Sequence, residues 1–242
     1  MFNKKRRLQL DAFLRSLELH TGLDAIVYSK DCSSLEPGEF KKDIIDIVAA
    51  NEYTMFCVDD TIFIDYFDIG NIQDLLRKHK KAIGFSLRLG KNTDYCYMKD
   101  RKQRLPEFFR VEYGCLKYNW VTAELDFAYP LEISSSVYRR NDILNTLTRV
   151  DFDTPTRLEV MLHRHKFLPS KSFLLCYWKS VAVGIPWNIV QEQSPNNRHG
   201  SLSEDYLDRL YSDGKRIDVE AYRGITINAV HQELPLILKG EQ

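Results

Sequence analysis

Apolar residues recur along the chain at two spacings, which predict helices that alternate with strands. Apolar positions three and four residues apart predict helices at residues 7–20, 40–48, 72–81, 137–150, 154–165 and 201–210. Short aromatic or β-branched runs predict strands at residues 25–28, 53–58, 61–64, 82–87, 173–177 and 181–183. This alternation indicates a single α/β domain, with a mostly parallel central sheet flanked by helices.

One predicted strand ends in two adjacent acids. The apolar run at residues 53–58 is followed directly by Asp59 and Asp60, and a second apolar run begins at Thr61. Two neighbouring carboxylates repel each other, so they must be solvated or must share a cation. Two interpretations follow: a solvated turn, or a divalent-metal and phosphate site at the carboxyl end of a central strand, where open α/β sheets bind ligands.

Two further pairs of charged residues lie where a site is expected. Arg88 and Lys91 come just after the strand at 82–87, where they would meet a phosphate or simply be solvated. Glu124 and Asp126 lie among aromatic residues, so they form either an active-site wall with a general base or the polar side of a half-exposed strand.

Composition narrows the class of protein. The chain has 242 residues, 44% of them hydrophobic, and its 34 basic residues balance 34 acidic ones, which gives no reason to expect a nucleic-acid partner. The five cysteines contain no CxxC pair and several stand in apolar runs, so we expect free thiols and a cytoplasmic protein. No apolar segment is long enough to span a bilayer.

Several well-known catalytic motifs are absent from the sequence. It contains no GxGxxG after a strand, no GxxxxGK[ST], no HExxH and no GxSxG. These absences argue against a dinucleotide oxidoreductase, a P-loop NTPase, a zincin and an α/β-hydrolase. Nucleotide-sugar enzymes fit what is left, because a cation held by carboxylates can carry the diphosphate in place of a glycine-rich loop.

Short segments spread along the chain carry a resemblance to a known family. They are residues 7–11, 56–63, 85–93, 95–97, 105–108, 128–131 and 228–233. On these segments the chain resembles a bacterial family of glycosyltransferases with the GT-A, or nucleotide-diphospho-sugar transferase, fold. The resemblance implies that a sugar moves from a nucleotide-diphosphate donor to an unknown glycan or other acceptor, with Mn²⁺ or Mg²⁺ as the cofactor.

The resemblance also implies roles for individual residues. Asp59 and Asp60 take the place of the acidic metal motif, although the family's usual form is Asp-x-Asp and Cys57 stands two positions before Asp59. A late histidine completes the metal shell in several such enzymes, which makes His231 the candidate third ligand. Arg88, with Lys91 beside it, would face the diphosphate. Glu124 or Asp126 would be the base for the acceptor in an inverting enzyme.

The amino end departs from the family pattern. Such domains open with an apolar strand, whereas here only residues 2–6 resemble the end of that strand, and the stretch between Tyr28 and Phe40 is short by about a helix and a strand. We therefore expect either a trimmed donor domain with weakened nucleotide binding or a chain whose true start lies upstream. In both cases residues 1–92 form the nucleotide-binding half and residues 93–242 the acceptor side. An incomplete sheet also leaves an edge open to self-association.

Two alternatives stay open at this level. The first is a non-catalytic relative that binds a nucleotide, a glycan or a partner chain. The second is a nucleotidyltransferase that makes the sugar nucleotide, although the usual glycine-rich and basic first loop of such enzymes is missing. The sequence does not identify the sugar, the acceptor or the nucleotide base.

Overall fold

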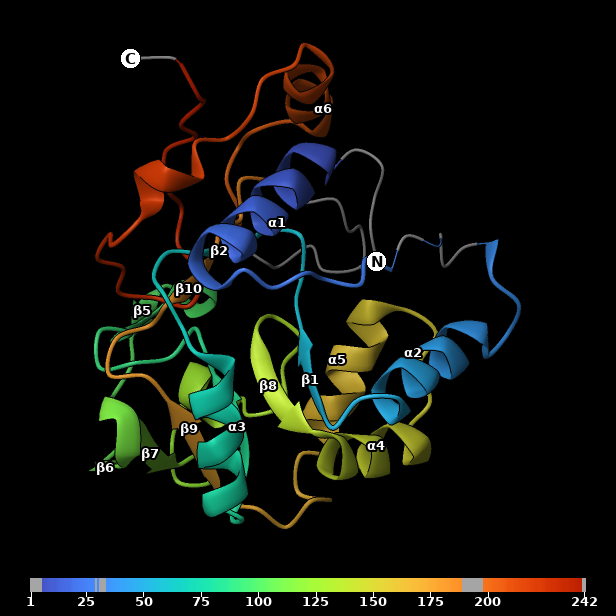
Figure 1. Ribbon diagram of the computed structural model, residues 1–242, viewed down its shortest axis with the longest axis vertical. Coiled ribbons are helices and arrows are strands. Elements are labelled where there is room, and N and C mark those ends of the chain that lie inside the picture. Colours follow the sequence, from blue (N-terminus) through green and yellow to red (C-terminus); the bar gives the residue numbers. More distant parts are fainter. Residues whose placement is uncertain (1–5, 29, 31–33, 189–197, 241–242) are drawn as a thin grey trace.

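A six-stranded sheet, built from strands far apart in the sequence, organises the fold (Figure 1). The structure is a computed structural model that describes residues 6–28, 30, 34–188 and 198–240. The strand order is β1-β8-β3-β9-β7-β6. The strands are β1 (Tyr53–Phe56), β3 (Ala82–Ser86), β6 (Phe108–Arg110), β7 (Leu116–Asn119), β8 (Ser136–Arg139) and β9 (Phe173–Cys176). Strands from both predicted halves of the chain therefore share one sheet, with β1 and β6 at its edges.

The prediction of a mostly parallel sheet was wrong for the described strands. Only β3 and β9 pair in parallel, and the other four neighbouring pairs in the sheet are antiparallel. Two of these pairs are made by β8, which lies between β1 and β3 and runs against both, with Phe56 opposite Ser136 and Phe85 opposite Val137. The other two are made by β7, which runs against β6 and β9. Val137 was predicted to lie in a helix, because the serines that lead into β8 give no apolar signal.

Helices cover both faces of this sheet (Figure 1). Alternating side chains of one strand point to opposite faces, so Val137 packs with α1 and α3 while Tyr138 packs with α2, α4 and α5. The same alternation places Leu174 and Leu175 in different clusters. The helices are α1 (Arg7–Thr21), α2 (Glu39–Ala49), α3 (Ile69–Lys78), α4 (Arg140–Arg149) and α5 (Pro155–Arg164).

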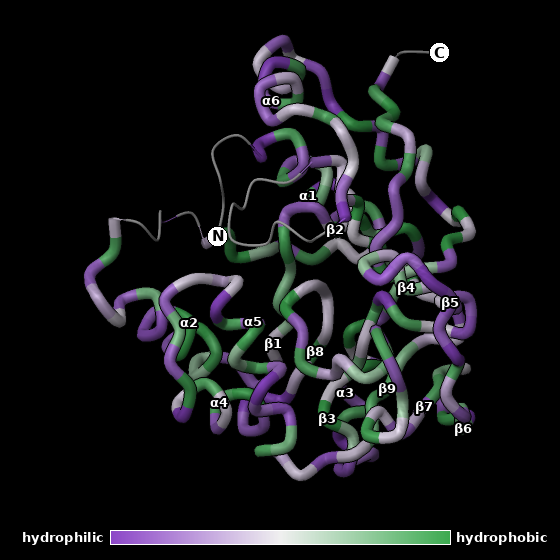
Figure 2. The backbone as a smooth tube through the Cα atoms, turned by 180° about the vertical axis from the view of Figure 1, so that it is seen from behind, coloured by the Kyte–Doolittle hydropathy of each residue, from purple (hydrophilic) through white to green (hydrophobic). Residues whose placement is uncertain are grey.

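A smaller unit extends the molecule beyond the end of the sheet at which β1 and β3 finish. It contains the two-stranded ladder of β2 (Thr61–Phe63) and β10 (Ala182–Gly184), together with α6 (Glu204–Ser212). Its apolar cluster includes Leu8 of α1, Ile62 of β2 and Leu207 of α6. Figure 2, seen from behind, shows α1 beside β2 and shows α2, α4 and α5 grouped below them. The chain thus passes from the sheet into this unit between β1 and β2.

Most predicted elements are present, but the strand predicted at residues 25–28 is not, and one predicted helix begins later than expected. The structure confirms the helices at 7–20, 40–48, 72–81, 154–165 and 201–210, with shifted ends, and only the later part of the one at 137–150. Residues 25–28 form no strand, and the side chain of Ile26 is 75% exposed. The expected remnant of an amino-terminal strand falls mostly on residues 2–5, which lie outside the described residues.

Candidate functional site

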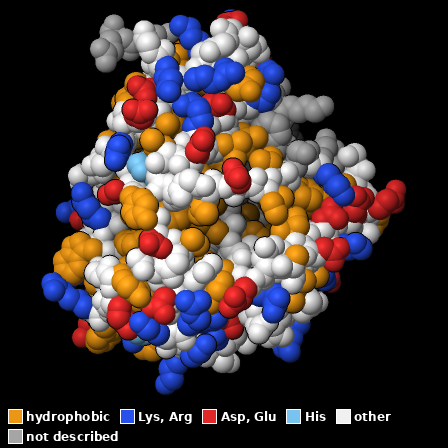
Figure 3. Space-filling model, in the orientation of Figure 1, with side chains coloured by type: hydrophobic (Ala, Val, Ile, Leu, Met, Phe, Trp, Pro, Cys, Tyr) orange, Lys and Arg blue, Asp and Glu red, His pale blue; other side chains and the backbone are white. Residues whose placement is uncertain are grey.

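Several of the predicted site residues gather at one end of the sheet. β1 and β3 end there, at Phe56 and Ser86, and the antiparallel β8 begins there, at Ser136. The polar side chains that follow β1 and β3, and those that precede β8, therefore come together. Figure 3 shows this face of the molecule hollowed between the part that carries α1 and the part that carries α5, and the β1–β2 segment runs beside the hollow (Figure 1).

The acid pair lies in the turn between β1 and β2 and is bridged by Arg6. The Nε and Nη2 atoms of Arg6 donate to Oδ1 of Asp59 at 3.0 and 2.8 Å. Nη2 also lies 3.2 Å from Oδ2 of Asp60. Burial raises the pKa of Asp60 against the opposing effect of Arg6. The pair is thus neither a solvated turn nor two free carboxylates.

A buried polar network fixes the position of Arg6. Its Nη1 atom donates to Oδ1 of Asn188 at 2.8 Å, and Gln9 donates to the same oxygen at 3.2 Å. All three side chains are buried. Burial alone would lower the pKa of Arg6, but Asp59 and Asp60 raise it, so the guanidinium stays charged. Sequence reasoning missed Arg6 as a site residue, because its partners lie 53 to 182 positions away in the chain.

Arg88 is the centre of a second group at the same edge. It is buried, and its Nη2 atom donates to Oε2 of Glu132 at 2.8 Å. Its Nη1 atom lies 3.0 Å from Nε2 of His231. Its Nε atom is buried and has no hydrogen-bond partner among the described residues, and the same is true of Oε1 of Glu132. Glu132 was not among the predicted site residues, because its partner Arg88 lies 44 positions away in the chain.

His231 reaches Arg88 because Gly184 leaves room for its ring. A Cβ atom on Gly184 would lie 2.6 Å from Cδ2 of His231, and residues 184 and 231 form a parallel bridge. Partial burial of the ring and the nearby charge of Arg88 lower the pKa of His231 to about 3. At neutral pH the ring is uncharged, so Nε2 accepts the hydrogen bond from Arg88.

The two predicted bases differ in their surroundings. Oδ1 of Asp126 accepts a weak hydrogen bond from the Cys96 thiol at 3.4 Å, and its Oδ2 is buried with no partner among the described residues. Burial raises the pKa of Asp126. Glu124 is exposed, and its Oε1 accepts from the backbone N–H of Arg104 at 2.9 Å. Asp126 is half-buried, with its Oδ2 atom shielded from solvent, whereas Glu124 is exposed.

The structure places the predicted phosphate contact Lys91 apart from this group. The Nζ atom of Lys91 lies 4.1 Å from the ring centroid of Trp178 and 5.8 Å from that of Phe108. The Lys91 side chain is exposed. Nothing in its described contacts joins it to Asp60 or Arg88, so Arg88 and Lys91 do not act as a pair.

Glu159 of α5 joins the group and was not expected there. It lies in the first half of the helix, whose cap is Thr154: the Thr154 hydroxyl accepts from the backbone N–H of Arg157 at 3.2 Å. Burial, and next the charge of Glu132, raises the pKa of Glu159 to about 7. A carboxyl group that holds its proton near neutral pH can take up or release one during a reaction.

One charge connects these side chains. Arg88 affects the pKa of four carboxyl or imidazole groups, those of Asp60, Asp126, Glu159 and His231. These groups therefore belong to one charged cluster, which we call the Arg88 cluster and define as Arg6, Asp59, Asp60, Arg88, Asp126, Glu132, Glu159 and His231.

The implied metal does not fit the described side chains. A divalent cation at the acid pair would compete with Arg6, which already binds one oxygen of each carboxylate, Oδ1 of Asp59 and Oδ2 of Asp60. At His231 it would take the Nε2 lone pair that accepts from Arg88. Among the described residues, no group of three or more histidine, cysteine, aspartate or glutamate side chains is placed to hold a metal ion. Each carboxylate keeps one oxygen that Arg6 does not bind, and Oδ1 of Asp60 is buried without a partner among the described residues, so a cation there would draw most of its ligands from outside the chain.

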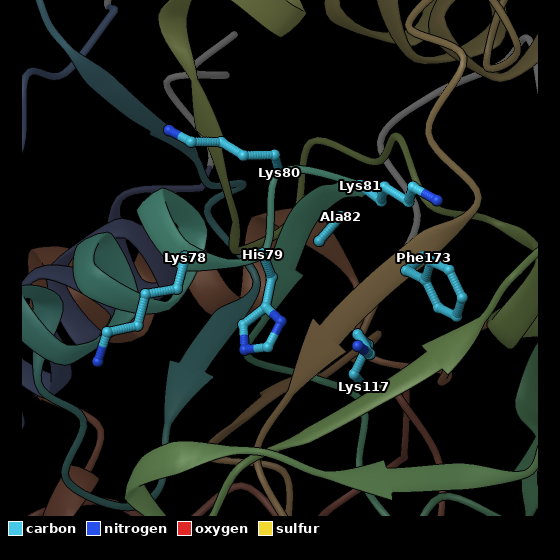
Figure 4. A pocket seen from close by; sticks show the side chains of 7 residues that line it. All are labelled: Lys78, His79, Lys80, Lys81, Ala82, Lys117 and Phe173. Carbon is cyan, nitrogen blue, oxygen red and sulfur yellow. The ribbon is translucent and has the colours of Figure 1, made fainter.

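A basic depression at the opposite end of the strands is a weaker candidate for a ligand site. It has a volume of about 290 Å³ and lies where β3 and β9 begin, at Ala82 and Phe173. Figure 4 shows that its lysine side chains point away from one another, so they do not converge on one anion. Ligands of α/β sheets bind at the carboxyl ends of the parallel strands, where the Arg88 cluster lies.

Comparison with known proteins gives one relative. The chain is 27% identical, over 211 residues, to the bifunctional glycosyltransferase pgtA of Dictyostelium discoideum; the match covers 76% of this chain and 27% of that protein. The chain therefore spans about a quarter of the relative's length. No family model and no solved structure matches the chain. The similarity supports a relationship to glycosyltransferases, whereas the GT-A fold and the bacterial family stay predictions.

Two further expectations concern membrane-spanning helices and disulfide bonds. Among the described residues, no helix combines the length and the apolar character that crossing a bilayer requires. Cys57, Cys96, Cys115 and Cys176 form no disulfides, as expected, and Cys32 lies outside the described residues. The cytoplasmic location, the lack of a nucleic-acid partner and self-association stay predictions.

Proposed function

We propose that the protein transfers a sugar from a nucleotide-diphosphate donor to an acceptor hydroxyl at the Arg88 cluster. The observation that carries the proposal is the match to a glycosyltransferase over 76% of this chain. The cluster supplies suitable chemistry at the sheet edge where such donors bind. Arginine side chains recognise phosphate oxygens, and buried carboxyl groups with raised pKa values are suited to accept a proton.

The reaction can be written from the side chains that are present. In an inverting transfer, the acceptor oxygen forms a bond to the anomeric carbon while the bond from that carbon to the diphosphate oxygen breaks. The proton of the acceptor hydroxyl passes to a carboxylate, and we assign this role to Asp126. Arg88 stabilises the negative charge that grows on the departing diphosphate, because a fixed cation in a buried site acts without reorganisation.

The direct test is to incubate the protein with UDP-, GDP-, dTDP- and CMP-sugars in turn. Turnover is measured as the amount of nucleotide released. We expect one donor class to react, and Asp126→Asn to slow the reaction by about a hundredfold or more. Glu124→Gln is the matched control, because that exposed carboxyl group lies two residues away; we expect it to keep nearly full activity. Equal losses in both variants would contradict the assignment of Asp126.

A non-catalytic binding protein is the second candidate. The observation in its favour is that Arg6 pairs with two of the three predicted metal ligands, Asp59 and Asp60. Nucleotide binding without any donor turnover, including hydrolysis by water, would favour this candidate over the enzyme.

A further inference from the structure

The acid pair expected to hold a metal already holds a cation that belongs to the chain. We propose that Arg6 and Arg88 replace the divalent metal, so that the donor diphosphate binds without one. This inference rests on the function proposed above. It states which groups supply the positive charge that binds the diphosphate. It differs from the resemblance, which implies that a metal ion supplies this charge.

Buried contacts hold Arg6 at the acid pair. Only 7% of its side chain is exposed, against 15% for Asp59 and 21% for Asp60. Solvated surface arginines change partners freely, but this one is held on its far side by Asn188, which also binds Gln9. Breaking such a buried pair leaves uncompensated charges, so Arg6 does not leave the carboxylates at low cost.

Arg88 has one N–H group that makes no hydrogen bond with the described residues. Its Nη1 and Nη2 atoms are used by His231 and Glu132, but the buried Nε–H has no partner among the described residues. An unsatisfied buried donor on a charged group is costly, and a phosphate oxygen would satisfy it. Two guanidinium groups also carry the same total charge as one Mg²⁺ or Mn²⁺.

A metal would be repelled where the resemblance places it. A cation bound to Nε2 of His231 would displace the guanidinium, whose Nη1 lies 3.0 Å from that nitrogen, or approach it closely. Like charges at such distances cost far more in a buried site than in water. At the acid pair, a cation would lie close to the guanidinium of Arg6, which binds one oxygen of each carboxylate, and the two positive charges would repel each other.

The test is calorimetric titration of the full chain with UDP, GDP, dTDP and CMP, each in EDTA and in Mn²⁺. For the nucleoside diphosphate that binds, we expect Kd to differ by less than about threefold between the two conditions. In Arg6→Ala, we expect Kd in EDTA to rise by about tenfold or more, because a charge-assisted contribution is lost. Mn²⁺ should restore binding, since the freed carboxylates can now hold it.

A second readout uses the metal alone. Electron paramagnetic resonance of Mn²⁺ should show no tight binding to the unmodified chain and measurable binding to Arg6→Ala. Arg7→Ala is the matched control, because the neighbouring Arg7 forms a more exposed ion pair with Asp208 at 2.7 Å; it should change neither readout. The comparison of EDTA with Mn²⁺ on the unmodified chain needs no variant and stands even if Arg6→Ala fails to fold.

The outcomes separate the inference from the function. Nucleotide binding to the unmodified chain that requires Mn²⁺ would overturn the inference and leave the proposed function intact. Binding of no nucleotide in either condition would count against the proposed function, and the inference would fall with it.

Discussion

Glu159 makes the stability of the folded chain depend on pH. Burial raises its pKa from an ordinary 4.5 to about 7, so near neutral pH it is partly protonated in the folded chain. In the unfolded chain it would lose that proton near its ordinary value. Between these two pKa values the folded chain binds more protons, and the free energy of unfolding therefore falls as pH rises through the window.

The resulting prediction concerns stability as a function of pH. Relative to Glu159→Gln, the unmodified chain should lose up to about 3 kcal/mol between pH 4.5 and pH 8, since one pKa unit corresponds to about 1.4 kcal/mol. Urea unfolding of both proteins across this range measures the difference. The exposed Glu124→Gln should not change the pH dependence. Identical curves for Glu159→Gln and the unmodified chain would refute the raised pKa.

At the scale of elements, strand β10 positions His231 through the missing side chain of Gly184. The added Cβ of Gly184→Ala would lie 2.6 Å from His231 Cδ2, which forces the ring to move. We expect a cost of about 1–3 kcal/mol from this overpacking. The cost should shrink in the His231→Ala background, as a double-mutant cycle by urea denaturation would show. A cost that is equal in both backgrounds would mean that Gly184 matters for another reason.

The elements themselves were partly predictable from the sequence. Helices such as α1 and α5 were found because their apolar faces and the residues at their ends are local signals. Strand β8 was missed because Ser136 and its neighbours carry little apolar pattern. Strands β6 and β7 were missed as well, and without these three strands the sheet seemed parallel. Residues 25–28 have strand-like composition, but they pair with no strand.

The site was less predictable than the fold, for a physical reason. Asp59, Asp60 and Arg88 could be found because they follow strands directly. Arg6 and Glu132 could not be given their roles, because their partners are distant in the sequence and each charge looks ordinary in its local context. Lys91, which looked equivalent to Arg88, turned out to lie over Trp178.

At the scale of the whole molecule, the Arg88 cluster is assembled from nearly the full length of the chain. Arg6 precedes α1, Glu132 precedes β8, and His231 comes from the last described segment. Because no short segment contains the site, it exists only in the folded chain. A ligand that binds this site must therefore stabilise the folded state against unfolding.

That linkage provides the most direct test of the central claim, that the Arg88 cluster binds a sugar nucleotide. The measurement is the melting temperature of the full chain with UDP, GDP, dTDP and CMP. We predict that one nucleotide at about a hundred times its Kd raises Tm by about 5 °C or more. Lys91→Ala should keep this rise and Arg88→Ala should lose it. No rise with any nucleotide, or a rise that Arg88→Ala retains, would contradict the claim.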